Sequence, residues 1–265
     1  MPVRKGTATV LTCALSAALV LTGCAAGHSP APAPPSARGA HDARGGHDGP
    51  DGGAGPDAAN RAPQRPRTPE RLPGVGPGTH ARIPDGTTQA LVVSGTDTDG
   101  NTVTAVLHER DPAGRWHPVA GPWTGHNALR GWTDAHEAGD LRSPTGVFRI
   151  GDAGGRLPDP GARVPYDQDE EFAVSGTGFL GEPLEGSFDY VVAIDYNRVA
   201  GTTPLNKERP LGPERGGGVW IHVDHGGPTQ ACVSLPRENM AELLRALDPA
   251  REPVVVMGPA AELAR

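Results

Sequence analysis

The sequence has little of what marks several large classes of protein. Only three of its 265 residues are cysteine, only 4% are aromatic, and acidic residues outnumber basic ones by 31 to 24. So few cysteines exclude the disulfide framework of small secreted domains. The negative balance argues against nucleic acid as a partner, because phosphate binding needs a basic surface.

Two of the three cysteines lie in the N-terminal segment. Arg4 and Lys5 precede a short apolar run over residues 10–20, which ends in Leu-Thr-Gly before Cys24. A basic start, a short apolar core and small residues are typical of an export signal, and the run is too short for a confident membrane span. The last four residues resemble a bacterial lipobox. We therefore predict a lipoprotein signal peptide over residues 1–23 and a lipid on the sulfur of Cys24.

This signal has consequences for charge, location and chemistry. Removing residues 1–23 leaves 22 basic against 31 acidic residues, a formal charge of −9, and a single free thiol at Cys232. The predicted location is extracytoplasmic, with the lipid holding the chain on the outer face of the cytoplasmic membrane, at the cell wall. An unpaired cysteine in an oxidising compartment deserves a functional explanation, although a small buried core cysteine is the common alternative.

Composition divides the rest of the chain into two parts. Residues 24–77 are rich in Pro, Gly and Ala and nearly lack large apolar side chains. Such a segment cannot bury enough apolar surface to fold, so we predict a disordered linker that begins at Cys24. Residues 78–265 are long enough to form one folded domain with a real core.

The folded domain is predicted to be mainly β. Alternating or continuous apolar runs predict strands at residues 89–94, 102–109, 115–120, 146–150, 190–194, 217–223 and 253–257. Met240, Leu243, Leu244 and Leu247 have helical spacing, which predicts one helix over residues 236–247. The expected fold is an antiparallel β-sandwich or barrel with long loops and one short helix after Cys232.

The strand region at residues 217–223 carries the best candidate for catalysis. The apolar strand ends in His222, and Cys232 follows after a glycine-rich loop. A thiol nucleophile needs a nearby base, and this stretch supplies both within ten positions. If His222 lowers the pKa of the thiol, an alkylating agent should label Cys232 at pH 6 faster than an ordinary cysteine.

Neighbouring residues suggest how such a pair would work. Asp224 and His222 share a face of a strand, so Asp224 is a candidate to orient the imidazole. The backbone N–H groups of Ala231 and Cys232 are placed to bind an oxyanion, and Thr229 offers a further hydroxyl donor. Gly226 and Gly227 would allow a substrate backbone to approach closely.

Two segments resemble one enzyme family. The stretch from His222 to Cys232 resembles the catalytic segment of L,D-transpeptidases, the YkuD (ErfK/YbiS) family, in which a His-Gly element precedes Ser-His-Gly-Cys-(Ile/Val)-Arg. Upstream, Ser143-Pro144-Thr145-Gly146 resembles the family's Asp-x-(Arg/Lys)-Thr-Pro-x-Gly-x-Phe segment. The resemblance covers about residues 85–258. It implies an L,D-transpeptidase-like domain that acts on peptidoglycan stem peptides through a thioester on Cys232, followed by cross-linking or hydrolysis, without a cofactor.

The sequence departs from the family pattern around the nucleophile. Gln230 and Ala231 replace the His and Gly that precede the cysteine, and Ser234 replaces the arginine that the family uses for substrate carboxylates. The chain thus resembles a divergent branch of secreted actinobacterial proteins. Gly226, Gly227, Gln230 and Ser234 form its predicted substrate loop.

Three alternatives remain open. His225 is a competing base. A zinc peptidase could use His222 and His225 with Asp224 and His136, but positions i and i+3 of a strand point to opposite faces. A catalytically inactive peptidoglycan-binding lipoprotein would retain the same groove. A metal is not expected in the Cys-His mechanism.

Overall fold

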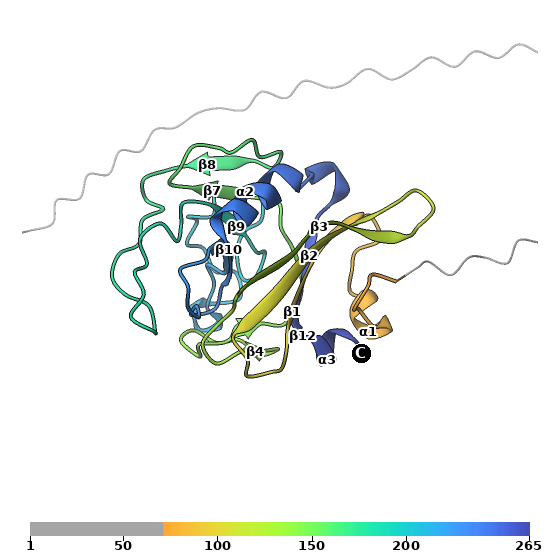
Figure 1. The fold of residues 1–265 in the computed structure, drawn as a ribbon, viewed down its shortest axis with the longest axis horizontal. Helices are drawn as coiled ribbons and strands as arrows, with labels where there is room; N and C mark the ends of the chain where they lie inside the picture. The colour runs from red at the N-terminus through yellow and green to blue at the C-terminus, as the bar shows by residue number, and fades with distance from the viewer. Residues whose placement is uncertain (1–70) are drawn as a thin grey trace, which may run out of the picture. The chain divides into compact units, whose positions relative to one another are not determined.

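A ten-stranded sheet forms the scaffold of the domain. The computed structural model describes residues 71–265. The strands follow the order β6-β12-β1-β2-β3-β11-β10-β9-β7-β8 across the sheet, and β4 pairs with β5 in a separate ribbon. Figure 1 labels most of these strands. The ten strands are β1 (Gln89–Gly95), β2 (Thr102–Arg110), β3 (Trp116–His126), β6 (Gly146–Arg149), β7 (Ala153–Gly155), β8 (Tyr166–Gln168), β9 (Val191–Ala193), β10 (Trp220–Val223), β11 (Val233–Leu235) and β12 (Val254–Pro259). The ribbon consists of β4 (Trp132–Thr133) and β5 (Ser143–Pro144).

The prediction of a mainly β fold with long loops is confirmed. Each of the seven predicted strand regions contains a strand, and the predicted helix is α2 (Arg237–Ala246). The sheet is mixed rather than purely antiparallel, because β1 pairs with β12, β10 with β11, and β7 with β8 in parallel. Two further one-turn helices, α1 (Pro77–His80) and α3 (Ala260–Leu263), lie at the ends of the described chain.

The parallel pair β10 and β11 is the part of the fold that builds the site. Parallel neighbours usually need a crossover of a dozen or more residues. Here only residues 224–232 connect them, so this short loop must return from the end of β10 to the level of its start. The register pairs Ile221 with Val233, which places Cys232 just before the first rung of β11.

Two clusters of apolar side chains stabilise the sheet, one on each face of β1 and β12. Leu91 and Val255 belong to the larger cluster, whereas Val92 and Val254 belong to the smaller one. Side chains alternate along a strand, so burial on both faces produces the near-continuous apolar runs seen in the sequence. The larger cluster also contains the apolar face of α2, namely Met240, Leu243 and Leu244.

The N-terminal end of the described chain belongs to the smaller cluster. Leu72 and Val75 are buried beside Ile83 and Leu263. The packed unit therefore includes residues before position 78, where the sequence suggested that it begins. The predicted signal peptide, Cys24 and most of the predicted linker lie outside the described residues. Between residues 71 and 265, no helix combines the length and the apolar character required to cross a membrane.

Candidate active site

Cys232 and His222 line the same cavity. It has a volume of about 470 Å³, and its wall is formed by parts of four segments, within residues 136–139, 174–188, 216–222 and 225–232. The end of β10 and the loop before β11 contribute the two predicted catalytic residues. The two residues that the sequence singled out for thiol chemistry therefore lie in one cavity.

The imidazole of His222 is fixed by backbone and by aromatic neighbours. Its Nδ1 lies 2.9 Å from the carbonyl oxygen of Val223, so Nδ1 carries the ring proton and donates a hydrogen bond to that carbonyl. Nε2 is then the unprotonated nitrogen of the neutral ring. The edge of Phe188 packs against the imidazole at a ring-centroid distance of 5.4 Å. His222 is thus held in the tautomer that a general base requires.

The sulfur of Cys232 lies against the start of β10. The N–H of Trp220 donates a hydrogen bond to Sγ over 3.4 Å. The thiol in turn donates a hydrogen bond to the carbonyl oxygen of Gly218 over 3.8 Å. Cys232 forms no disulfide. The thiol is therefore held at the cavity wall by backbone groups of the strand that carries His222.

Burial changes the ionisation of both groups in a direction that the sequence did not predict. Desolvation raises the pKa of the Cys232 thiol to about 11, although the Trp220 N–H opposes this. Desolvation lowers the pKa of His222 to about 4, and the Val223 carbonyl only partly offsets the effect. The resting pair at neutral pH is a thiol and a neutral imidazole rather than a thiolate and an imidazolium. These pKa shifts predict slow alkylation at pH 6, the opposite of the expectation from the sequence, and they require the thiol proton to move during attack.

Two hydroxyl groups hold the backbone carbonyl of Cys232. Thr229 Oγ1 donates to the Cys232 carbonyl oxygen over 2.7 Å, and Ser143 Oγ donates to the same oxygen over 3.1 Å. The hydroxyl proton of Thr229 is thus already used, so Thr229 does not serve as the oxyanion donor suggested above. Ser143 is a site residue that the sequence indicated only through its motif, since 89 positions separate it from Cys232.

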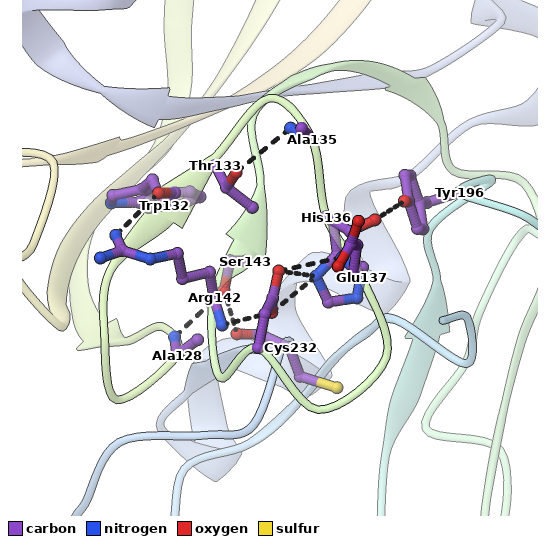
Figure 2. Close-up of polar contacts among 11 residues, drawn as sticks. Ala128, Trp132, Thr133, Ala135, His136, Glu137, Arg142, Ser143, Tyr196 and Cys232 are labelled. Carbon is purple, nitrogen blue, oxygen red and sulfur yellow. Dashed lines mark hydrogen bonds and ion pairs between the residues drawn. The ribbon is translucent and has the colours of Figure 1, made fainter. Parts of the chain in front are cut away.

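Figure 2 shows how the upstream motif reaches Cys232. The carboxylate of Asp140 accepts hydrogen bonds from the backbone N–H groups of Glu137 and Arg142 and from Nδ1 of His136. The Arg142 guanidinium in turn donates to the Trp132 carbonyl. These bonds shape the loop between β4 and β5, which forms one wall of the cavity and ends at Ser143.

Asp224 does not orient His222. Its carboxylate accepts from His126 Nδ1 over 2.9 Å and from the Ser234 hydroxyl over 2.8 Å. These hydrogen bonds keep the pKa of Asp224 below its usual value despite partial burial. Because β10 ends at Val223, the strand alternation that predicted a shared face with His222 does not extend to residue 224. Asp224 instead joins the end of β10 to β3 and β11.

The predicted substrate loop is only partly assembled. Gln230 is exposed and lines the cavity, but Ser234 is fully buried in β11 with its hydroxyl on Asp224. Ser234 is therefore a structural residue. Gly226 has a positive φ of 84°, and a side chain at Gly227 would meet the Glu182 carboxylate at 2.1 Å. The close approach seen at Gly227 is therefore to the side chain of Glu182.

His225 lies in the cavity beside His222. The two rings stack with an interplanar angle of 11° and a centroid distance of 5.9 Å. His225 Nδ1 is 3.1 Å from Glu182 Oε1, and both side chains are nearly buried. His225 follows the end of β10 and belongs to the loop, so the strand alternation that would place the two rings on opposite faces does not apply to it. Sequence reasoning missed Glu182, since nothing local connects it with residue 225.

The proposed metal ligands have other partners. Nδ1 of His222, His225 and His136 is committed to the Val223 carbonyl, Glu182 and Asp140, respectively. Among residues 71–265, no three His, Cys, Asp or Glu side chains gather in a way that could hold a metal ion.

The mainly β fold and the cysteine–histidine cavity agree with the comparison against protein families. The model for YkuD, the L,D-transpeptidase catalytic domain, matches residues 92–256. This match covers more than half of the chain, and the protein belongs to that family. Members of the family are typically cysteine-dependent transpeptidases. The comparisons with curated proteins and with solved structures found no match.

Proposed function

We propose that this protein is a cysteine acyltransferase that acts on peptidoglycan stem peptides. The observation that carries the proposal is the cavity itself, which holds a free thiol and a histidine whose Nδ1 is occupied by a backbone carbonyl. Such a pair forms acyl-enzymes on many folds. The family supplies the substrate class.

The chemistry follows from the ionisation of the pair. Cys232 attacks the carbonyl carbon of a stem-peptide bond while its proton passes to Nε2 of His222. His222 returns that proton to the departing amine, which leaves a thioester on Cys232. An amine of a second stem peptide or a water molecule then attacks the thioester, and the sulfur leaves and regains its proton. The first acceptor gives a cross-link and the second gives hydrolysis.

The direct test is intact mass spectrometry of the full chain with Cys13→Ser and Cys24→Ser, so that Cys232 is the sole thiol. Incubation with tetrapeptide-containing muropeptides, and separately with a carbapenem, should add one acyl group to this protein and none to the Cys232→Ala variant. Exhaustive chelation should leave the adduct unchanged, and a thiol alkylator should prevent it. Loss on chelation with recovery on zinc would instead favour a metallopeptidase.

An inactive binding protein is the second candidate. The raised pKa of Cys232 favours it, because a thiol that stays protonated is a weak nucleophile. Binding of muropeptides without any adduct, at every pH tested, would support this alternative.

We further propose that Cys24 carries lipid and anchors the protein outside the cytoplasm. The lipobox-like residues before Cys24 support the proposal. Cys24→Ala should release the protein to the medium or leave it with its signal uncleaved. A mature-sized Cys24→Ala protein in the membrane fraction would contradict the anchor.

A further inference from the structure

We propose that Ser143 is a positioning residue that organises the oxyanion site beside Cys232. The inference deepens the proposed acyl transfer and rests on Cys232 as its nucleophile. Ser143 does not need to touch the substrate. It acts by fixing the peptide group that follows the reactive thiol.

The hydrogen bonds around Ser143 leave its hydroxyl one orientation. The side chain is fully buried in β5. The N–H of Ala128 donates to Ser143 Oγ over 3.0 Å, so the hydroxyl proton points to the Cys232 carbonyl, 3.1 Å away (Figure 2). With Thr229 Oγ1 on the same oxygen, both lone pairs of this carbonyl are occupied. The Cys232 peptide group cannot rotate without breaking two hydrogen bonds.

The short segment between Thr229 and Cys232 is therefore anchored at both ends. Thr229 bonds through its N–H to the Asn127 carbonyl and through its carbonyl to the Leu129 N–H, each over 2.9 Å. The fixed Cys232 carbonyl holds the other end. Between these anchors, the N–H groups of Ala231 and Cys232 donate to no other group within the described chain. Unpaired amides in a fixed loop beside a nucleophile are what a developing oxyanion requires.

The part of the chain that carries Ser143 is itself rigidly held. The Ser143 N–H donates to the Gly131 carbonyl over 2.8 Å, and the Asp140 carboxylate shapes the preceding loop through its bonds to His136, Glu137 and Arg142. Preorganised donors are effective because they need no reorganisation when charge develops. The upstream motif thus contributes to catalysis from a position 89 residues away from Cys232.

Two thiol reactions separate this role from a merely structural one. With p-nitrophenyl acetate, Cys232 attacks the ester carbonyl, His222 takes the thiol proton, and p-nitrophenolate leaves; the carbonyl oxygen is negative in the intermediate. With iodoacetamide, the sulfur displaces iodide from a saturated carbon, and no oxyanion forms. Loss of the oxyanion site should slow only the first reaction.

The experiment compares the two rates at one pH for the full chain with Cys13→Ser and Cys24→Ser. Ser143→Ala should slow acylation roughly tenfold to a hundredfold, less than deletion of an oxyanion donor, because the amides are displaced and not removed. Alkylation should not change. Ser143→Thr keeps the hydroxyl and should acylate normally. Ser94→Ala is the matched control, since its hydroxyl bonds to the Thr104 carbonyl in the β1–β2 hairpin.

The outcomes separate cleanly. Equal loss of both reactions in Ser143→Ala, or loss of neither, overturns the inference. If Ser143→Ala does not fold, Thr229→Val provides the test, because it removes the other hydroxyl that bonds to the Cys232 carbonyl. This variant should show the same selective loss of acylation, and the absence of that loss overturns the inference. The inference and the proposed function can also be told apart. If Ser143→Ala slows only ester acylation, but the unsubstituted Ser143 protein forms no thioester with muropeptides, the inference is supported and the proposed function fails.

Discussion

His222 at the end of β10 and His225 in the loop that follows differ in what holds their rings. The carbonyl of the next residue in its own strand holds His222, whereas the carboxylate of Glu182, 43 positions away, holds His225. The ring orientation of His222 therefore depends on backbone, and that of His225 depends on another loop. A base whose orientation comes from the sheet remains in place when neighbouring side chains change.

This contrast supports the proposal that His222 is the base and His225 only its neighbour, and replacement of each residue tests that assignment. His222→Gln should lower thioester formation by on the order of 10²–10⁴, the usual contribution of a general base. His225→Gln should cost much less, because the Val223 carbonyl still orients His222. Single-turnover acylation by intact mass measures both effects, with His117→Gln on the exposed part of β3 as the control. A larger loss in His225→Gln would reverse the assignment.

The pH dependence of the thiol gives the next largest effect. Because burial raises the pKa of Cys232 to about 11, iodoacetamide should label it at pH 7 more slowly than an ordinary thiol by on the order of 10². Labelling should rise with pH until the thiolate dominates near pH 11. A labelling rate that is already maximal at pH 7 would show that the thiolate forms in the resting protein.

The dependence of the acylation rate on pH, at its acid end, tests whether the charges of the two histidines interact. His222 must be neutral to accept the thiol proton, so acylation should persist down to about pH 4, the lowered pKa of His222, and fall below it. Positive charge on His225 is one cause of that lowered pKa. His225→Gln should therefore raise the pKa of His222 and move the fall in activity to higher pH. An unchanged acid limb would mean that the stacked rings do not interact electrostatically.

Asp224 should matter for stability more than for the mechanism. Asp224→Asn weakens the bonds to His126 and Ser234, which join three strands, and bonds to a charged group contribute roughly 1.5–3 kcal/mol each. We expect a loss of this order in the free energy of unfolding, measured by urea titration. The charge of Asp224 is the weakest of the causes acting on the pKa of His222 and raises it, so the acid limb of acylation should move only slightly, to lower pH. A large shift of that limb would show that Asp224 acts strongly on His222.

The smallest effect is expected for Glu182. Glu182→Gln keeps a group that can accept from His225 Nδ1 but removes the charge, so the ring should remain in place. Acylation should change only a few-fold, within the range of one weakened hydrogen bond. Glu182→Ala should cost more than Glu182→Gln, because it also removes the acceptor of the Leu180 N–H. Equal rates in both variants would indicate that Glu182 does not position His225.

The parts of the fold that were predicted correctly depend on local pattern. The run from Gln89 is buried on both faces and forms β1, and the i, i+3, i+4 spacing of Met240, Leu243 and Leu244 forms the inner face of α2. Periodicity of this kind is set by backbone geometry, so it can be read along the chain. The short strands β4, β5, β7, β8 and β11 escaped prediction because two or three residues carry no period.

The site, like the fold, was predicted correctly only where residues close together in the sequence determine it. His222 and Cys232 were found because a strand, a glycine loop and a thiol follow one another in the sequence. Asp224 was misassigned because one residue beyond the strand end is enough to break alternation. Ser234 was assigned to substrate from a motif position, but its place in β11 puts it in the core.

The sequence by itself determined the candidate nucleophile and base, the longer segments of the sheet, and the helix whose apolar face joins the larger apolar cluster. Only the tertiary structure decided the partners of these groups: Ser143 for the Cys232 carbonyl, His126 for Asp224, and Glu182 for His225. Those partners come from segments 43 to 98 positions apart, brought together by sheet order and loop paths. The ionisation of the pair was decided in the same way, because desolvation depends on what covers a group and not on its neighbours in the chain.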